Sequence, residues 1–353
     1  MHGMSFRTAS EKSRPSRRTL LLAGGAALTG LAGTGIIVSA KSDEKTAEKD
    51  FGTRVGEFNI ARSKEFLKPS ALYNKTGPQS FAFDDENRLI YTLQLIQGGI
   101  ELPGERGALT TGSRRQYGDM CVTRLDFDGK IRGHMYLRGF GHGISLGVEP
   151  SGRRTHLWIE GDADDETGYG RTVTRVPFRD GEVLDSTDDG VRHQEPLPGA
   201  RATHPAVDLE SRRVLVSFRE GPERRYAVYP MDKFRKGGHG PEHELADVWQ
   251  RDGESFQGCA LYGDHIYQLT GSPYTDDEGE NPPSGGGNTY VAAINVQTGE
   301  RAGRQLVTAA PDLEFREPEG IAVTLSGGRP QLCVGFSVKS GDRRKLTVYR
   351  FTP

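Results

Sequence analysis

The stretch EPEGIAVTLSGGRPQLCVGFS, residues 317–337, contains two short apolar runs separated by a polar turn rich in Gly and Pro. Short runs of Ile, Val, Leu and Phe bounded by such residues are typical of β-strands joined in a hairpin. Glu319 and Gly320 stand directly before the first run. Because a carboxylate beside a buried strand costs free energy unless other groups satisfy it, Glu319 requires partners from elsewhere in the chain.

The same pattern occurs five times along the chain. In each copy a polar residue precedes a glycine or another small residue, and an apolar strand, a polar turn and a second apolar strand follow. The polar positions are separated by 63, 62, 53 and 62 residues, which leaves room for four strands in each unit. Five such units predict an all-β fold, a five-bladed β-propeller. The five polar positions are Gln79, His142, His204, Gln257 and Glu319.

The last unit runs out of chain after three strands, EGIAVTL, QLCVGFSV and KLTVYRF. A blade with an unpaired edge is unfavourable, so its fourth strand must come from another part of the chain. The segment TRVGEFNIAR, residues 53–62, precedes the first unit and has no other assigned place. We therefore expect the last blade to be closed by this N-terminal strand.

The N-terminus carries a pattern typical of export. Arg17 and Arg18 precede a Gly-, Ala- and Leu-rich stretch that ends in Val38, Ser39 and Ala40. This predicts a twin-arginine-type signal peptide over residues 1–40, with an uncleaved membrane anchor as the alternative. Residues 41–52 are expected to form a disordered spacer before a propeller over residues 53–353. The expected location is secreted or extracytoplasmic and associated with the cell wall, with only transient membrane contact through the signal.

Composition narrows the classes of partner. The chain has 46 Lys and Arg against 48 Asp and Glu, so it lacks the basic excess of a nucleic-acid-binding protein. Its three cysteines, Cys121, Cys259 and Cys333, are widely spaced in apolar runs. An odd number in such positions predicts buried free thiols, with a Cys259–Cys333 disulfide as the alternative.

The first strand of each propeller blade lines the central axis, so the five polar positions should form a ring at one mouth of the channel. The second strands return to the same mouth, where Gln94, Glu160 and Arg219 should form a rim. Trp158 lies two residues before Glu160, on the same side of its strand, and is expected to add an aromatic wall. Such a site suits a polyhydroxylated or phosphate-bearing ligand. The alternative is a ring that only organises water or an ion.

His142, His204 and Glu319 are also candidates for metal binding and catalysis. Their side chains suit a divalent cation in the central channel, although their spacing matches no local zinc motif. A glycosidase would need two flanking carboxylates, for which Glu319 and Glu160 are the candidates. A lyase or phosphodiesterase would use His142 or His204 as its base.

Three stretches also carry a family resemblance: PQSFAFD at residues 78–84, HGISLGVE with HLWIEGD at 142–162, and EPEGIAV at 317–323. They resemble the propeller of teichoic acid biosynthesis protein C-like proteins and of receptor-binding proteins of some staphylococcal phages. The resemblance covers residues 53–353 and implies a five-bladed propeller. For the phage proteins, it implies that this domain engages wall teichoic acid.

These observations lead to one main functional hypothesis. The chain is expected to be an exported propeller that binds a teichoic-acid-like cell-wall glycopolymer or a related carbohydrate at its channel mouth. The first alternative is an enzyme, a hydrolase or lyase that cleaves glycans or phosphodiesters through Glu319 and His142 or His204. The second alternative is a structural scaffold for protein interactions.

Overall fold

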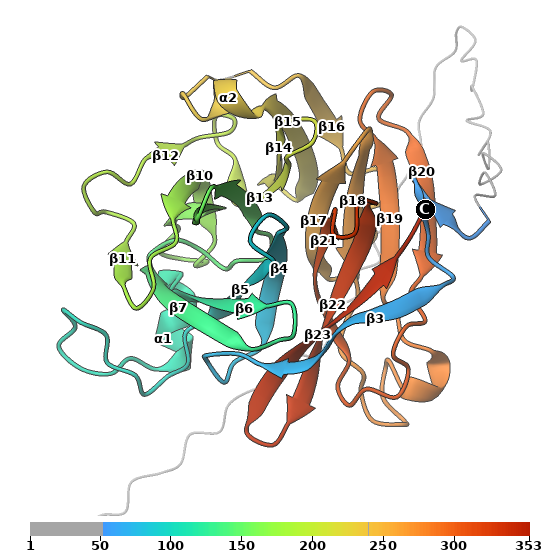
Figure 1. Ribbon diagram of the computed structural model, residues 1–353, viewed down its shortest axis with the longest axis horizontal. Coiled ribbons are helices and arrows are strands. Elements are labelled where there is room, and N and C mark those ends of the chain that lie inside the picture. Colours follow the sequence, from blue (N-terminus) through green and yellow to red (C-terminus); the bar gives the residue numbers. More distant parts are fainter. Residues whose placement is uncertain (1–51, 239) are drawn as a thin grey trace, which may run out of the picture. The chain divides into compact units, whose positions relative to one another are not determined.

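The computed structural model describes residues 52–238 and 240–353, which form five antiparallel blades (Figure 1). The expected signal peptide and nearly all of the expected spacer lie outside these residues. The prediction of an all-β, five-bladed propeller is confirmed. No helix in the described part of the chain is long and apolar enough to cross a membrane.

Each blade takes its strands largely in chain order. Blade 1 consists of β4 (Pro78–Asp84), β5 (Leu89–Leu95), β6 (Met120–Asp126) and β7 (Ile131–Arg138), with α1 (Thr111–Tyr117) between β5 and β6. Blade 2 consists of β8 (Gly147–Ser151), β9 (Arg154–Ala163), β10 (Gly170–Pro177) and β12 (His193–Gln194). Blade 3 consists of β13 (Arg201–Asp208), β14 (Arg213–Glu220), β15 (Glu223–Pro230) and β16 (His243–Ala246), with α2 (Met231–Phe234) after β15.

The remaining blades complete the ring. Blade 4 consists of β17 (Phe256–Tyr262), β18 (His265–Thr270), β19 (Tyr290–Asn295) and β20 (Arg301–Leu306), with the 3-10 helix η1 (Pro283–Gly285) between β18 and β19. Blade 5 consists of β21 (Glu317–Thr324), β22 (Gln331–Ser340), β23 (Arg343–Phe351) and β3 (Ser63–Ala71). One short strand crosses between blades: β11 (Val183–Asp185) follows β10 of blade 2 but pairs in parallel with β7 of blade 1.

The fourth strand of blade 5 comes from the N-terminal side, but the expected segment was wrong. β3 pairs with β23, placing Leu67 opposite Val348. Residues 53–62 instead form a hairpin of β1 (Arg54–Val55) and β2 (Phe58–Asn59), in which the N–H of Gly56 donates to the carbonyl of Ala302 on blade 4. Gly56 has a φ of +54°, which breaks the segment into two short strands. β3 and β23 are each nine residues long and so can run side by side.

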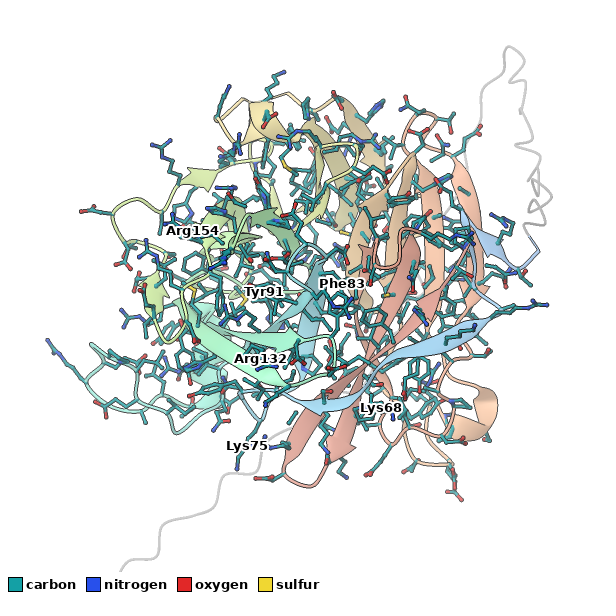
Figure 2. All side chains as sticks on the ribbon, in the orientation of Figure 1. Lys68, Lys75, Phe83, Tyr91, Arg132 and Arg154 are labelled. Carbon is teal, nitrogen blue, oxygen red and sulfur yellow. The ribbon has the colours of Figure 1, made fainter. Side chains whose placement is uncertain are left out.

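Apolar side chains fill the space between neighbouring blades. Figure 2 labels two of these side chains: Phe83, between blades 5 and 1, and Tyr91, between blades 1 and 2. Each of the five junctions between blades has its own buried cluster, whose members include Leu93 and Leu157, Trp158 and Val214, Leu215 and Ile294, Tyr267 and Phe336, or Phe81 and Leu346. The three cysteines are buried and free, as predicted.

Close contact between the inner strands explains the glycines that follow the polar positions. The inner strands β4, β13, β17 and β21 lie around the centre in Figure 1 and contact their neighbours in turn. A Cβ atom added at Gly320 would lie 2.8 Å from the Cα of Ser80 on β4. One added at Gly258 would lie 2.9 Å from the carbonyl oxygen of Ile144. Only glycine allows these backbones to approach so closely.

A buried arginine fixes the approach to β21. The Arg316 guanidinium donates hydrogen bonds to the carbonyls of Val307 and Ala309 and lies 4.6 Å from the ring of Phe336. Backbone carbonyls and an aromatic face therefore stabilise a charge that would otherwise be costly to bury. The contacts hold in place the chain directly before Glu317 and Glu319.

Gly320→Ala is expected to lower the free energy of unfolding by about 2–5 kcal/mol, because the new methyl group meets Ser80 and the backbone φ is +91°. Gly327 is the matched control, since its φ is +82° but nothing surrounds its Cβ position. Gly327→Ala should cost only about 1–2 kcal/mol. Urea denaturation of both variants measures the difference. Equal losses would contradict a role for crowding at the axis.

Candidate functional site

The predicted polar positions lie at one end of the inner strands. Shifts in the strand register at this end set the direction of their side chains. The register shifts between Pro78 and Ser80 on β4, between Phe256 and Gly258 on β17, and between Pro318 and Ile321 on β21. Gln79, Gln257 and Glu319 therefore sit in bulges, which turn a side chain away from the regular face of its strand. The register of β13 shifts just before His204, and His142 lies in the loop before β8.

Two neighbouring hollows make up this mouth. The first, which we call the carboxyl hollow, has a volume of about 400 Å³ and is lined by Gln79, His142, Gln257, Glu317, Glu319, Arg115 and Arg344 among others. The second, the arginine hollow, has a volume of about 480 Å³ and is lined by His204, Arg171, Arg201, Arg219 and Arg224 among others. Both hollows are lined by Ile144, Tyr169, Ser255 and Phe256. One ligand can therefore contact both.

The structure brings all five polar positions and Arg219 to this mouth, but it places Gln94, Glu160 and Trp158 elsewhere. Gln94 is fully buried, and its side-chain amide donates to the carbonyls of Asn74 and Thr76. Trp158 is fully buried, and its indole N–H donates to Glu149 at 2.8 Å. Glu160 is also fully buried and lines neither hollow. Both side chains do lie on one face of β9, as expected. That face packs against blade 3 and does not open to the mouth, so the expected rim and aromatic wall were wrong at these two positions.

The aromatic surface of the mouth is formed by Tyr169 and Phe256. The ring of Tyr169 stacks on His142, with centroids 4.7 Å apart. The ring of Phe256 lies 3.4 Å from the guanidinium carbon of Arg224 and stacks on His204 at 5.9 Å. Phe256 directly precedes a repeated polar position, so its place in the repeat could have identified it. Tyr169 follows an acidic loop and has no counterpart in the repeat.

Glu160 is an ionised carboxylate held beneath the mouth by hydrogen bonds. It accepts the backbone N–H groups of His142, Gly143 and Gly170 at 2.8–3.0 Å and the Nδ1 of His204 at 2.9 Å. Burial alone would raise the pKa of Glu160, but the hydrogen bonds from His204 and from these N–H groups lower it overall. One carboxylate thus joins the loop before β8 to β10 and β13.

The two histidines of the mouth are neutral at pH 7. Burial lowers the pKa of His142 to about 4. Burial also lowers the pKa of His204, despite the opposing effect of Glu160. A neutral His204 must carry its proton on Nδ1 in order to donate to the ionised Glu160, which leaves Nε2 as a hydrogen-bond acceptor.

Glu317 and Glu319 form a carboxyl pair that shares a proton. Burial raises the pKa of both groups, and that of Glu319 lies well above its ordinary value. The two side chains hydrogen-bond to each other, so Glu319 holds the proton and donates it to Glu317. Arg344 lies close enough to lower both pKa values, although less strongly than burial raises them. Burial and the neighbouring Glu317 therefore favour the protonated form of Glu319.

Arg224 carries a buried charge without a carboxylate partner. Its side chain is only 6% exposed, and it donates to the Ser217 hydroxyl at 2.9 Å. Within residues 52–238 and 240–353, no carboxylate lies within ion-pair distance of it; the charge of Asp247 acts on it from farther away, and burial lowers its pKa overall. Arg219, which lines the same hollow, donates to the carbonyl of Pro222. Four arginines line the arginine hollow against two carboxylates, Asp164 and Glu254, and Glu254 pairs with Arg304 at 2.6 Å, so the hollow has an excess of positive charge.

The described residues do not support the expected divalent cation. Among them, no group of three or more His, Cys, Asp and Glu side chains is arranged to hold a metal ion. Glu319 shares its proton with Glu317, His204 donates to Glu160, and neither arrangement leaves a set of converging ligands. His142, His204 and Glu319 thus do not fit a common metal site.

Comparison with known proteins identifies the class of this protein. A family model described as the phage 5-bladed beta propeller receptor binding platform domain matches residues 78–350. The chain belongs to this family. A curated relative, "Putative major teichoic acid biosynthesis protein C" of Bacillus subtilis (strain 168), is 26% identical over 290 residues, which cover 79% of this chain and 60% of the relative.

One of the similar solved structures shares the fold. The tail fibre of Staphylococcus aureus phage P68 superposes with a TM-score of 0.61 at 18% identity, covering 82% of this chain and 52% of the fibre. An α-L-arabinofuranosidase from Lactobacillus brevis gives a TM-score of 0.44 at 9% identity, covering 80% of this chain and 93% of the enzyme. The chain thus spans less than two thirds of the curated relative and of the tail fibre.

The carboxyl pair predicts a specific pH dependence of stability. Because the folded-state pKa of Glu319 lies above its ordinary value of 4.5, the folded protein retains a proton that the unfolded chain releases. The stability linked to this proton is fully present below pH 4.5 and is lost as the pH rises toward the folded-state pKa.

Glu319→Gln should remove this loss, because the amide can still donate to Glu317 without titrating. We expect the variant to be more stable than the parent at neutral pH by about 1–3 kcal/mol, the scale of burying a polar group without compensation. Thermal unfolding between about pH 4 and pH 8 measures the slope. Glu300→Gln, at an exposed position, is the control. A parental slope in Glu319→Gln would contradict the shared proton.

Proposed function

We propose that this protein binds an anionic, teichoic-acid-like glycopolymer of the cell surface at its channel mouth. The observation that carries the proposal is the buried guanidinium of Arg224, which lines the arginine hollow without a carboxylate partner. Ser217 and the ring of Phe256 compensate the charge of Arg224 only in part, and a bound anion would compensate it more strongly. The phosphates of a wall glycopolymer would supply that anion.

The composition of the arginine hollow favours phosphate over a lone carboxylate. Arg201 and Arg219 come from neighbouring strands of blade 3, where they face each other across the β13–β14 pair. Several guanidinium groups around one hollow match the several oxygens of a phosphate, to which each can donate two hydrogen bonds. Arg171 is less available because it pairs with Asp162 at 3.0 Å.

The carboxyl hollow supports binding of the sugar or polyol part of such a polymer. Gln79 and Gln257 place side-chain amides beside the protonated carboxyl pair, so donors and acceptors for hydroxyl groups lie together. Tyr169 and Phe256 separate the two hollows and present apolar faces. A repeating unit with a phosphate at one end and hydroxyls at the other would match this arrangement.

The relatives support the same ligand class. The matching family model describes a receptor-binding platform of phages, one solved relative is a phage tail fibre, and the curated relative is named for teichoic acid biosynthesis. A wall glycopolymer also fits the expected export through residues 1–40, which lie outside the described residues. An interaction scaffold would not require an unpaired arginine in the mouth.

The geometry argues against a conventional glycosidase. Such an enzyme needs two carboxylates about 5–10 Å apart on either side of the bond. Glu160 is enclosed and saturated with hydrogen bonds, while Glu317 and Glu319 contact each other. Among the described residues that line the carboxyl hollow, these two are the only carboxylates.

Arg224→Gln is expected to weaken binding to purified, phosphate-bearing wall glycopolymer about tenfold or more, the effect of losing a charged hydrogen bond. Binding of the purified protein is measured by sedimentation with insoluble wall material, together with circular dichroism as a check of folding. Arg212→Gln is the control, because Arg212 pairs with Asp232 at the opposite end of blade 3. Full binding by a folded Arg224→Gln protein would contradict the proposal.

A further inference from the structure

His204 is held more rigidly than a binding residue requires. Its Nδ1 donates to Glu160 at 2.9 Å, and Glu160 is itself fixed by three backbone N–H groups. Phe256 stacks on one side of the imidazole, and the ring of Tyr169 meets it edge-on at 6.0 Å. The side chain is 1% exposed, yet it lines the arginine hollow. Because Nδ1 is bonded to Glu160, Nε2 is the ring nitrogen left for a ligand in the hollow that His204 lines.

This arrangement is that of a general base. A carboxylate that binds one ring nitrogen selects the tautomer and orientation of the imidazole and leaves the other nitrogen free to accept a proton. The neighbouring arginines attract an anion, so an anionic group is expected to bind beside Nε2. A base placed beside a bound phosphodiester can therefore act on a hydroxyl of the same polymer.

We propose that the arginine hollow cleaves phosphodiesters in the bound polyol phosphate, with His204 as the catalytic base and Glu160 as its positioning residue. This rests on the proposed function, since it requires that the polymer binds in this hollow. Its substrate is a phosphodiester with a free hydroxyl on the adjacent carbon of the polyol.

The step is an intramolecular transesterification that consumes no other reactant. His204 Nε2 takes the proton of the adjacent hydroxyl, and the hydroxyl oxygen forms a bond to phosphorus. The bond from phosphorus to the oxygen of the next unit breaks, and that oxygen takes the proton from His204. The products are one chain that ends in a cyclic phosphodiester and one that ends in a hydroxyl. Arg219 and Arg224 stabilise the negative charge on the phosphoryl oxygens during the transfer.

The test uses poly(glycerol phosphate) with free hydroxyls and the full-length protein. Cleavage is followed by phosphorus NMR, which distinguishes a cyclic phosphodiester from the linear diester, and by the size of the products. The parental protein is expected to produce the cyclic end group. His204→Asn should reduce the rate at least about 100-fold, the usual contribution of a general base. The asparagine amide can still donate to Glu160, so folding and polymer binding should remain within about threefold of the parent.

His156→Asn is the matched control, because it removes an imidazole from the same strand as Glu160 but outside both hollows. It should cleave at the parental rate. Parental protein that binds the polymer without forming the cyclic end group would overturn this inference and leave the proposed binding function intact. Cleavage by His204→Asn at the parental rate, or cleavage of a polymer whose hydroxyls are blocked, would also overturn it. Absence of binding would overturn the proposed function itself.

Discussion

The organisation of the mouth depends on one buried carboxylate. Glu160 remains ionised in the interior because four donors surround it, three from the backbone and one from His204. These donors belong to the loop before β8, the start of β10 and the inner strand β13. A single charge therefore fixes segments of two blades relative to one another. It acts from beneath the mouth, by holding the residues that line the hollows, and does not itself line them.

The propeller could be predicted from the sequence because its repeat is enforced locally. Gly258 and Gly320 follow polar positions because neighbouring inner strands approach too closely there for a side chain, so the constraint is visible in the sequence of these copies. The closing strand could not be identified in this way. β3 shows only a weak alternation of charged and apolar residues and contains Pro69, so its sequence is typical of a connecting segment. β11 has three residues, and its parallel pairing with blade 1 depends on the path of the whole chain.

The candidate site was predictable to the extent that it follows the repeat. A position at the start of an inner strand has the same direction in every blade, so Gln79, His204, Gln257 and Glu319 were expected at one mouth and lie there. The residues that give the site its electrostatic character are not repeated. Arg224 comes from the start of a third strand, and the partner of Glu319 is Glu317, two residues earlier in the same strand. Whether Trp158 faces a mouth or a neighbouring blade depends on packing between blades, which cannot be predicted from the sequence of one blade.

The place of β3 in blade 5 has a consequence for synthesis of the chain. This strand is made before every other strand of the five blades, but its partner β23 is made last. The backbone groups of β3 therefore stay unpaired while the other blades form. Lys64, Glu65, Lys68 and Pro69 make such a strand a poor partner for other exposed edges. The polar residues that make β3 hard to recognise as a strand thus also keep it from pairing with other strands before β23 is made.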